Sequence, residues 1–75
     1  MNVGMMWFDD DPKTTLVDKI ERAAKYYRQK YGLNPNICFV NPSLLPEPAP
    51  KVNIAIVPYQ PILKWNFWIG IREHN

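Results

Sequence analysis

Only one segment of this chain can form a long helix, and prolines interrupt most of the sequence after it. Asp11-Pro12 is a favourable opening pair, because Asp caps helices and Pro suits the first helical position. Gly32 is a typical C-cap, and Pro35 prevents continuation. Between them the apolar positions follow helical spacing: Leu16, Ile20, Ala23, Ala24, Tyr27 and Tyr31. We therefore predict a helix over about 12–31, with Thr15 to Asp18 as a competing, weaker start.

The remaining apolar residues form short runs that are typical of strands. We predict strands at 37–40, 52–57 and 65–71, separated by turns and by the proline-rich loop 42–50, PSLLPEPAP. That loop can begin with a single turn, and Leu44 and Leu45 are expected to reach the core. Residues 5–8 are a candidate fourth strand, parallel to 37–40. The sequence thus predicts an α+β fold, with one amphipathic helix on a three- or four-stranded, mainly antiparallel sheet.

With 75 residues the chain is long enough for one small domain, whose core alone gives marginal stability. We expect residues 1–6 to be disordered and 72–75 to form a tail. The only cysteine is Cys38 and the only histidine is His74, so neither an internal disulfide nor a Cys/His zinc site is available within one chain. A partner subunit is the remaining way to add stability. We expect a cytoplasmic protein with no membrane segment and no signal peptide.

The two faces of the predicted sheet differ in character. Alternation directs one set of residues toward the helix: Val52, Ile54, Ile56, Phe67, Ile69 and Ile71. The opposite face carries Trp68 among the small residues Ala55, Val57 and Gly70, together with Cys38 or its neighbours. An apolar face of this kind favours a protein–protein interface, most simply a homodimer or a complex with another protein. The contact is expected through the face around Trp68 or through an edge strand. Alternatively, the N-terminal apolar segment or the proline-rich loop folds over this face.

A nucleic-acid interface is the second functional hypothesis. The predicted helix carries six bases and two acids, and Lys19, Arg22, Tyr26 and Lys30 share one flank of it. Basic side chains beside an exposed aromatic ring can bind phosphates while the ring stacks on a nucleobase. A solvated flank that keeps a small protein soluble explains the same pattern, and we favour that explanation.

Catalytic chemistry has little support in this sequence. Cys38 lies in an apolar run with no base nearby, so we expect an inert buried thiol. Asp9, Asp10 and Asp11 suit helix capping better than metal binding, because consecutive carboxylates without further ligands hold cations weakly. We therefore expect no enzymatic activity, no metal and no cofactor.

The layout resembles that of a group of small bacterial proteins. The residues that carry the resemblance are 26–32, YYRQKYG, then Pro35-Asn36 before a strand, Asn41-Pro42 after it, and 67–70, FWIG. These motifs are structural, and no activity is attached to the group. The resemblance therefore implies a shared fold and no functional residue.

Overall fold

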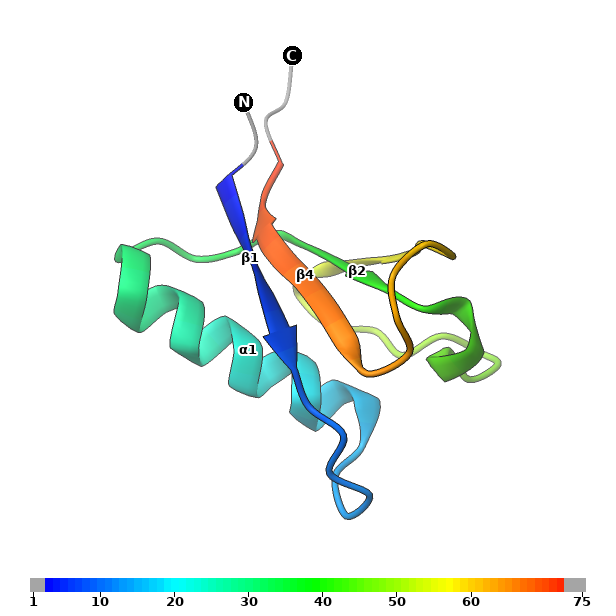
Figure 1. Cartoon of the computed structure of the whole chain (residues 1–75). Helices are drawn as coiled ribbons and strands as arrows, with labels where there is room; N and C mark the ends of the chain where they lie inside the picture. Colours follow the sequence, from blue (N-terminus) through cyan, green and yellow to red (C-terminus); the bar gives the residue numbers. More distant parts are fainter. Residues whose placement is uncertain (1–2, 73–75) are drawn as a thin grey trace.

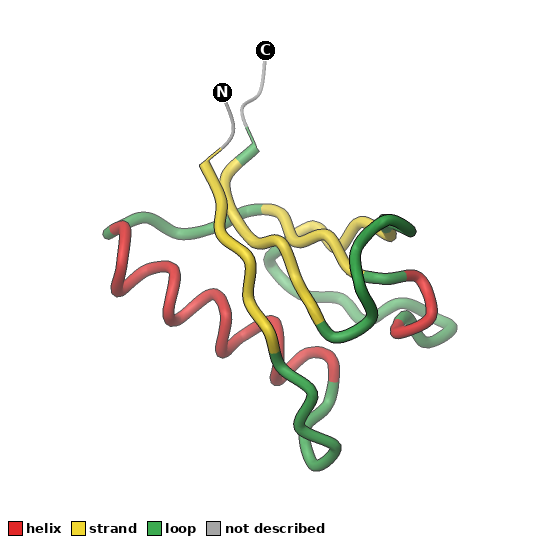
Figure 2. The backbone as a smooth tube through the Cα atoms, viewed as in Figure 1, coloured by secondary structure: helices red, strands yellow, loops and turns green. Residues whose placement is uncertain are grey.

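A computed structural model describes residues 3–72, which form one helix on a four-stranded mixed sheet (Figures 1 and 2). The elements follow the order β1 (Val3–Phe8), α1 (Leu16–Tyr31), β2 (Ile37–Val40), the 3-10 turn η1 (Pro42–Leu44), β3 (Ala55–Pro58) and β4 (Asn66–Ile71). The α+β class predicted from the sequence is confirmed. The tail residues 73–75, which include His74, lie outside the described residues.

The strand order is β1-β4-β2-β3, so the strand that comes last in the sequence lies in the middle of the sheet. β4 pairs antiparallel with both β1 and β2, whereas β2 pairs parallel with β3. β1 and β2 are therefore parallel to each other with β4 between them. The fourth strand expected at 5–8 is present and begins at Val3, so the disorder expected for residues 1–6 is wrong from residue 3 onward.

Helix α1 begins several residues later than its predicted first turn. The N-cap is Thr15, whose hydroxyl accepts from the Asp18 N–H at 3.1 Å while the Asp18 carboxylate accepts from the Thr15 N–H at 3.2 Å. The competing start was thus the right one, and Asp11 is not the cap. The Asp11 side chain instead accepts from the N–H of Lys13, which holds residues 12–14 in a turn. At the other end Gly32 is the C-cap, with a φ of 71°.

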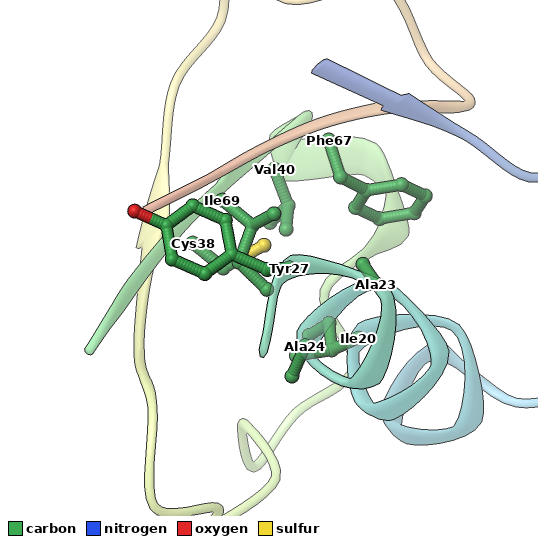
Figure 3. Packing of buried hydrophobic residues seen from close by; sticks show 8 residues of the cluster. All are labelled: Ile20, Ala23, Ala24, Tyr27, Cys38, Val40, Phe67 and Ile69. Carbon is green, nitrogen blue, oxygen red and sulfur yellow. The ribbon is translucent and has the colours of Figure 1, made fainter. Parts of the chain in front are cut away.

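The core lies between α1 and one face of the sheet (Figure 3). Four helix residues meet four strand residues there: Ile20, Ala23, Ala24 and Tyr27 against Cys38, Val40, Phe67 and Ile69. Phe67 and Ile69 were expected on this side, and Cys38 joins them. Of the two alternatives for the opposite face, Cys38 or its neighbours, the neighbours Ile37 and Phe39 lie there, because the register sets Cys38 beside Ile69.

The proline-rich segment supplies the rest of the cover on the core side. Leu44, Leu45 and Ile54 are half-buried and pack against the core cluster, as the sequence predicted for the two leucines. β3 is shorter than expected and begins at Ala55. Its first partner is Ile37, and the residues before Ile37 belong to a turn that contains Pro35. Residues 52–54 therefore have no strand to pair with. Of the helices within residues 3–72, none is both long and apolar enough to cross a membrane.

Candidate interaction surface

The side of the sheet that faces away from α1 is the candidate site, and we call it the open face. Strand alternation and the register place these residues on it: Gly4, Met6, Phe8, Ile37, Phe39, Ala55, Val57, Asn66, Trp68 and Gly70. No member of this set carries a charge. The open face is therefore an uncharged surface built from all four strands, and Asn66 is its only polar side chain among the residues named.

Trp68 lies at the centre of the open face, on the central strand β4. It is half-buried, with Met6 beside it on β1 and Phe39 beside it on β2. The rings of Trp68 and Phe39 have centroids 5.3 Å apart, and Phe39 in turn lies 5.5 Å from the ring of Tyr59. Such tilted pairs are favourable aromatic contacts. They form a continuous row of rings across the sheet.

A shallow depression lies along this row. Its volume is about 360 Å³, and its lining consists of Met6, Phe39, Tyr59, Ile62 and Trp68. The segment between β3 and β4 forms one border, where the Asn41 side-chain amide donates to the Ile62 carbonyl at 2.8 Å. Its lining is wholly apolar or aromatic, so the depression suits an apolar side chain of another molecule.

Large apolar side chains on the open face are accessible to solvent. Phe8 is 60% exposed, Met6 is 55% exposed, and Tyr59 at the border is 48% exposed. The N-terminal segment does not cover this face, because it forms β1 and contributes Met6 and Phe8 to the surface. The leucines of the proline-rich loop pack on the core side. Within residues 3–72, neither segment that we considered as a cover seals the open face.

All four residues expected at the interface lie on the open face: Trp68, Ala55, Val57 and Gly70. Their exposure differs, since Gly70 is buried, Trp68 and Val57 are half-buried and Ala55 is exposed. The residues that sequence reasoning missed are Met6, Phe8 and Tyr59, whereas Phe39 was expected only as a neighbour of Cys38. β1 gave no alternation signal, because Met5, Met6, Trp7 and Phe8 are consecutive apolar residues and do not show which side faces the core.

One member of the basic flank expected for nucleic acid is not accessible. Lys19 is only 3% exposed, and its ammonium group contacts the Asp11 carbonyl, the Thr14 hydroxyl at 2.7 Å and the Asp9 carboxylate at 3.4 Å. Arg22 lies 3.8 Å from the Asp9 carboxylate. Lys19 is thus unavailable to phosphate, and Arg22 is already close to an acid.

The aromatic member and the last base of that flank are engaged as well. The Tyr26 ring lies 5.1 Å from the ring of Trp7, and the Lys30 ammonium lies 5.4 Å from the ring centre of Tyr31. Burial therefore removes Lys19 from the predicted flank, whereas Arg22, Tyr26 and Lys30 remain exposed.

The acidic run and the cysteine have structural surroundings. Asp9 and Asp11 neighbour Lys19 and Arg22 rather than capping the helix, which corrects the capping prediction. Residues 3–72 contain no group of three His, Cys, Asp or Glu side chains that could hold a metal ion. Burial raises the pKa of the Cys38 thiol to about 12, so the group stays protonated and unreactive at neutral pH.

Comparisons of this chain with models of known families, with curated proteins and with solved structures found no match.

Proposed function

We propose that this chain is a non-enzymatic protein–protein interaction module that works as a homodimer, with the open face as its self-association surface. The observation that carries the proposal is the difference between the two sides of the sheet. One side is covered by α1 and the proline-rich segment, whereas the other presents exposed Met6 and Phe8 beside Trp68. Burial of such a surface against a second protein contributes free energy in proportion to the apolar area removed from water.

A second copy suits this surface for two reasons. In a two-fold dimer the same patch contacts itself, so any charge near the axis would lie close to its own copy. The open face carries no charge, and self-contact brings no repulsion there. In addition, a 75-residue domain has a small core, and a subunit contact is a common source of further stability. We place this module in the cytoplasm, in line with its single unpaired thiol.

The test uses a matched pair of variants. Phe8 is 60% exposed on the open face, and Leu33 is 54% exposed in the turn after α1. Both are large apolar residues, so Phe8→Ser and Leu33→Ser remove comparable exposed apolar surface from different places. We expect Phe8→Ser to weaken self-association at least about tenfold, or roughly 1.4 kcal/mol, and Leu33→Ser to leave it unchanged.

Light scattering coupled to gel filtration gives the mass of each variant over a concentration series, and circular dichroism confirms that each is folded. A wild-type protein that stays monomeric at its highest soluble concentration would overturn the proposal. Equal weakening by both substitutions would also contradict it, because the association would then not be specific to the open face.

A further inference from the structure

The outer edge of β1 is the part of this surface that the structure defines most sharply. β1 is an edge strand, with β4 on its inner side. The Asp9 N–H donates to the Trp65 carbonyl at 3.0 Å, directly after the pair Phe8 and Asn66 in the register. In an antiparallel ladder the residues that bond to the neighbour alternate with residues that do not. Because Asp9 bonds to β4, the alternate residues Trp7 and Met5 also direct their backbone groups toward β4.

The alternate residues of β1 direct their backbone groups away from the sheet. These are Gly4, Met6 and Phe8, each of which presents an N–H and a C=O at the outer edge. The side chains of Met6 and Phe8 also lie on the open face, and Gly4 shares their side of the strand. The apolar surface and the free hydrogen-bonding edge thus come from the same three residues.

This edge lacks the features that usually prevent strand addition. Val3–Phe8 contains no charged residue and no proline over six residues. The other edge strand differs, because β3 has only four residues and its last is Pro58, which has no N–H to donate. The β1 edge is therefore the better site for another strand.

We infer that two copies of this chain join β1 to β1 as antiparallel strands about a two-fold axis at Met6. This inference rests on the proposed self-association and places the contact at the β1 border of the open face, so the two open faces lie side by side in one sheet and Phe39 and Tyr59 stay accessible. Met6 then lies opposite Met6 of the second copy, and Gly4 lies opposite Phe8 of the second copy. Each of the three outward residues forms both of its backbone hydrogen bonds with the residue opposite it in the second copy. The two sheets then become one sheet of eight strands.

Side-chain sizes match in this register. The ring of Trp68 lies over Gly4, where a Cβ would come within 3.0 Å of ring carbons. Phe8 of the second copy, on the same face and directly opposite Gly4, therefore meets the edge of the Trp68 ring. The smallest residue of the strand is paired with the largest of the three, and aromatic contact across the axis adds to the ladder. An unrelated partner strand has no such built-in match, so the occupant is a second copy.

Cysteine cross-linking tests the register. Residues facing each other across the axis have Cα atoms about 5.5 Å apart, within the range of a disulfide. Met6→Cys should therefore form a covalent dimer under mild oxidation. Phe8→Cys is the control, because four residues of offset separate the two Phe8 positions by roughly 14 Å. Cys38 is buried in both variants and should not cross-link. Cross-linking of Phe8→Cys but not Met6→Cys would overturn the inference.

A second pair of variants separates this inference from the proposed function. Met6→Pro removes an outward N–H without removing a bond to β4, and Met6→Val keeps that N–H. We expect Met6→Pro to weaken self-association at least tenfold and Met6→Val to preserve it. A folded Met6→Pro variant that dimerises like wild type would refute the edge contact while leaving the proposed homodimer intact. A monomeric wild type would refute both, and if Met6→Pro fails to fold, the cysteine pair decides.

Discussion

The indole ring of Trp68 occupies the space that a side chain at Gly4 would need. A Cβ built on Gly4 would lie within 3.0 Å of three ring carbons of Trp68. The two residues are near neighbours on adjacent strands, because Gly4 pairs with Gly70 and Met6 pairs with Trp68. This close approach fixes how far the ring extends toward the β1 edge.

The variant Gly4→Ala is expected to destabilise the fold by roughly 1–3 kcal/mol, since the added methyl group forces the ring or the strand to move. Urea denaturation measures the loss. The control repeats the substitution in a Trp68→Leu background, where the ring is absent and the cost should fall. An equal cost in both backgrounds would show that the ring does not cause the effect.

The variant Lys19→Met should lower the free energy of unfolding by about 2 kcal/mol. The buried ammonium group bonds to the Thr14 hydroxyl and the Asp11 carbonyl, and both lose this partner. Lys25→Met is the matched control on the exposed side of the same helix, and its effect should stay within about 0.5 kcal/mol. Hydrogen exchange should also show faster exchange in residues 11–15 for Lys19→Met alone. Equal stability of the two variants would contradict this account.

The position of the helix start can be tested with Thr15→Ala and Pro12→Ala. Thr15 caps α1, so its loss should cost about 1 kcal/mol. Pro12 precedes the helix and is exposed, and its replacement should change stability by less than about 0.5 kcal/mol. Thermal unfolding followed by circular dichroism compares the two variants. A larger loss for Pro12→Ala would favour a helix that begins at Pro12.

The thiol of Cys38 should make stability depend on alkaline pH. Its pKa rises from 9.0 to about 12 in the folded protein because burial disfavours the thiolate. As pH rises, the unfolded chain therefore loses this proton first. The thiol's contribution to the free energy of unfolding is complete below pH 9 and is lost between pH 9 and 12. Within that window the advantage of wild type over Cys38→Ala should shrink by roughly 1.4 kcal/mol per pH unit.

Urea denaturation of both proteins at about pH 8 and about pH 10, on either side of the ordinary thiol pKa, gives that difference directly. The pKa of Tyr27 is also raised by burial, but Tyr27 is present in both proteins. Its contribution to the pH dependence therefore cancels in the difference. A difference that stays constant with pH would show that the thiol is not protected as the structure indicates.

Local signals were sufficient for several elements. Gly32 marks the end of α1, the spacing of Ile20 and Tyr27 marks its buried side, and the alternation of Phe67 and Ile69 marks the core face of β4. Each of these depends on residues close in sequence and on the period of one element. The presence of Trp68 on the face away from the helix followed from the same alternation.

Other features depend on contacts between distant segments and could not be seen locally. The exposed Met6 and Phe8 acquire their position only when β4 pairs with β1. Lys19 is buried because residues 9–14 turn back over it, although helical spacing placed it on an exposed flank with Arg22 and Lys30. Helical spacing describes one element alone, and it does not show which neighbour covers a given side.

The place of β4 in the sheet determines when the chain can fold during its synthesis. β1 and β2 leave the ribosome well before β4, yet they have no direct pairing with each other. A nascent chain that ends before Asn66 therefore has nothing to join β1 to the pair formed by β2 and β3, and its helix lacks Phe67 and Ile69 to pack against. Cooperative folding must wait for β4 to emerge. Until then the apolar segments stay exposed, and exposed apolar surface promotes aggregation.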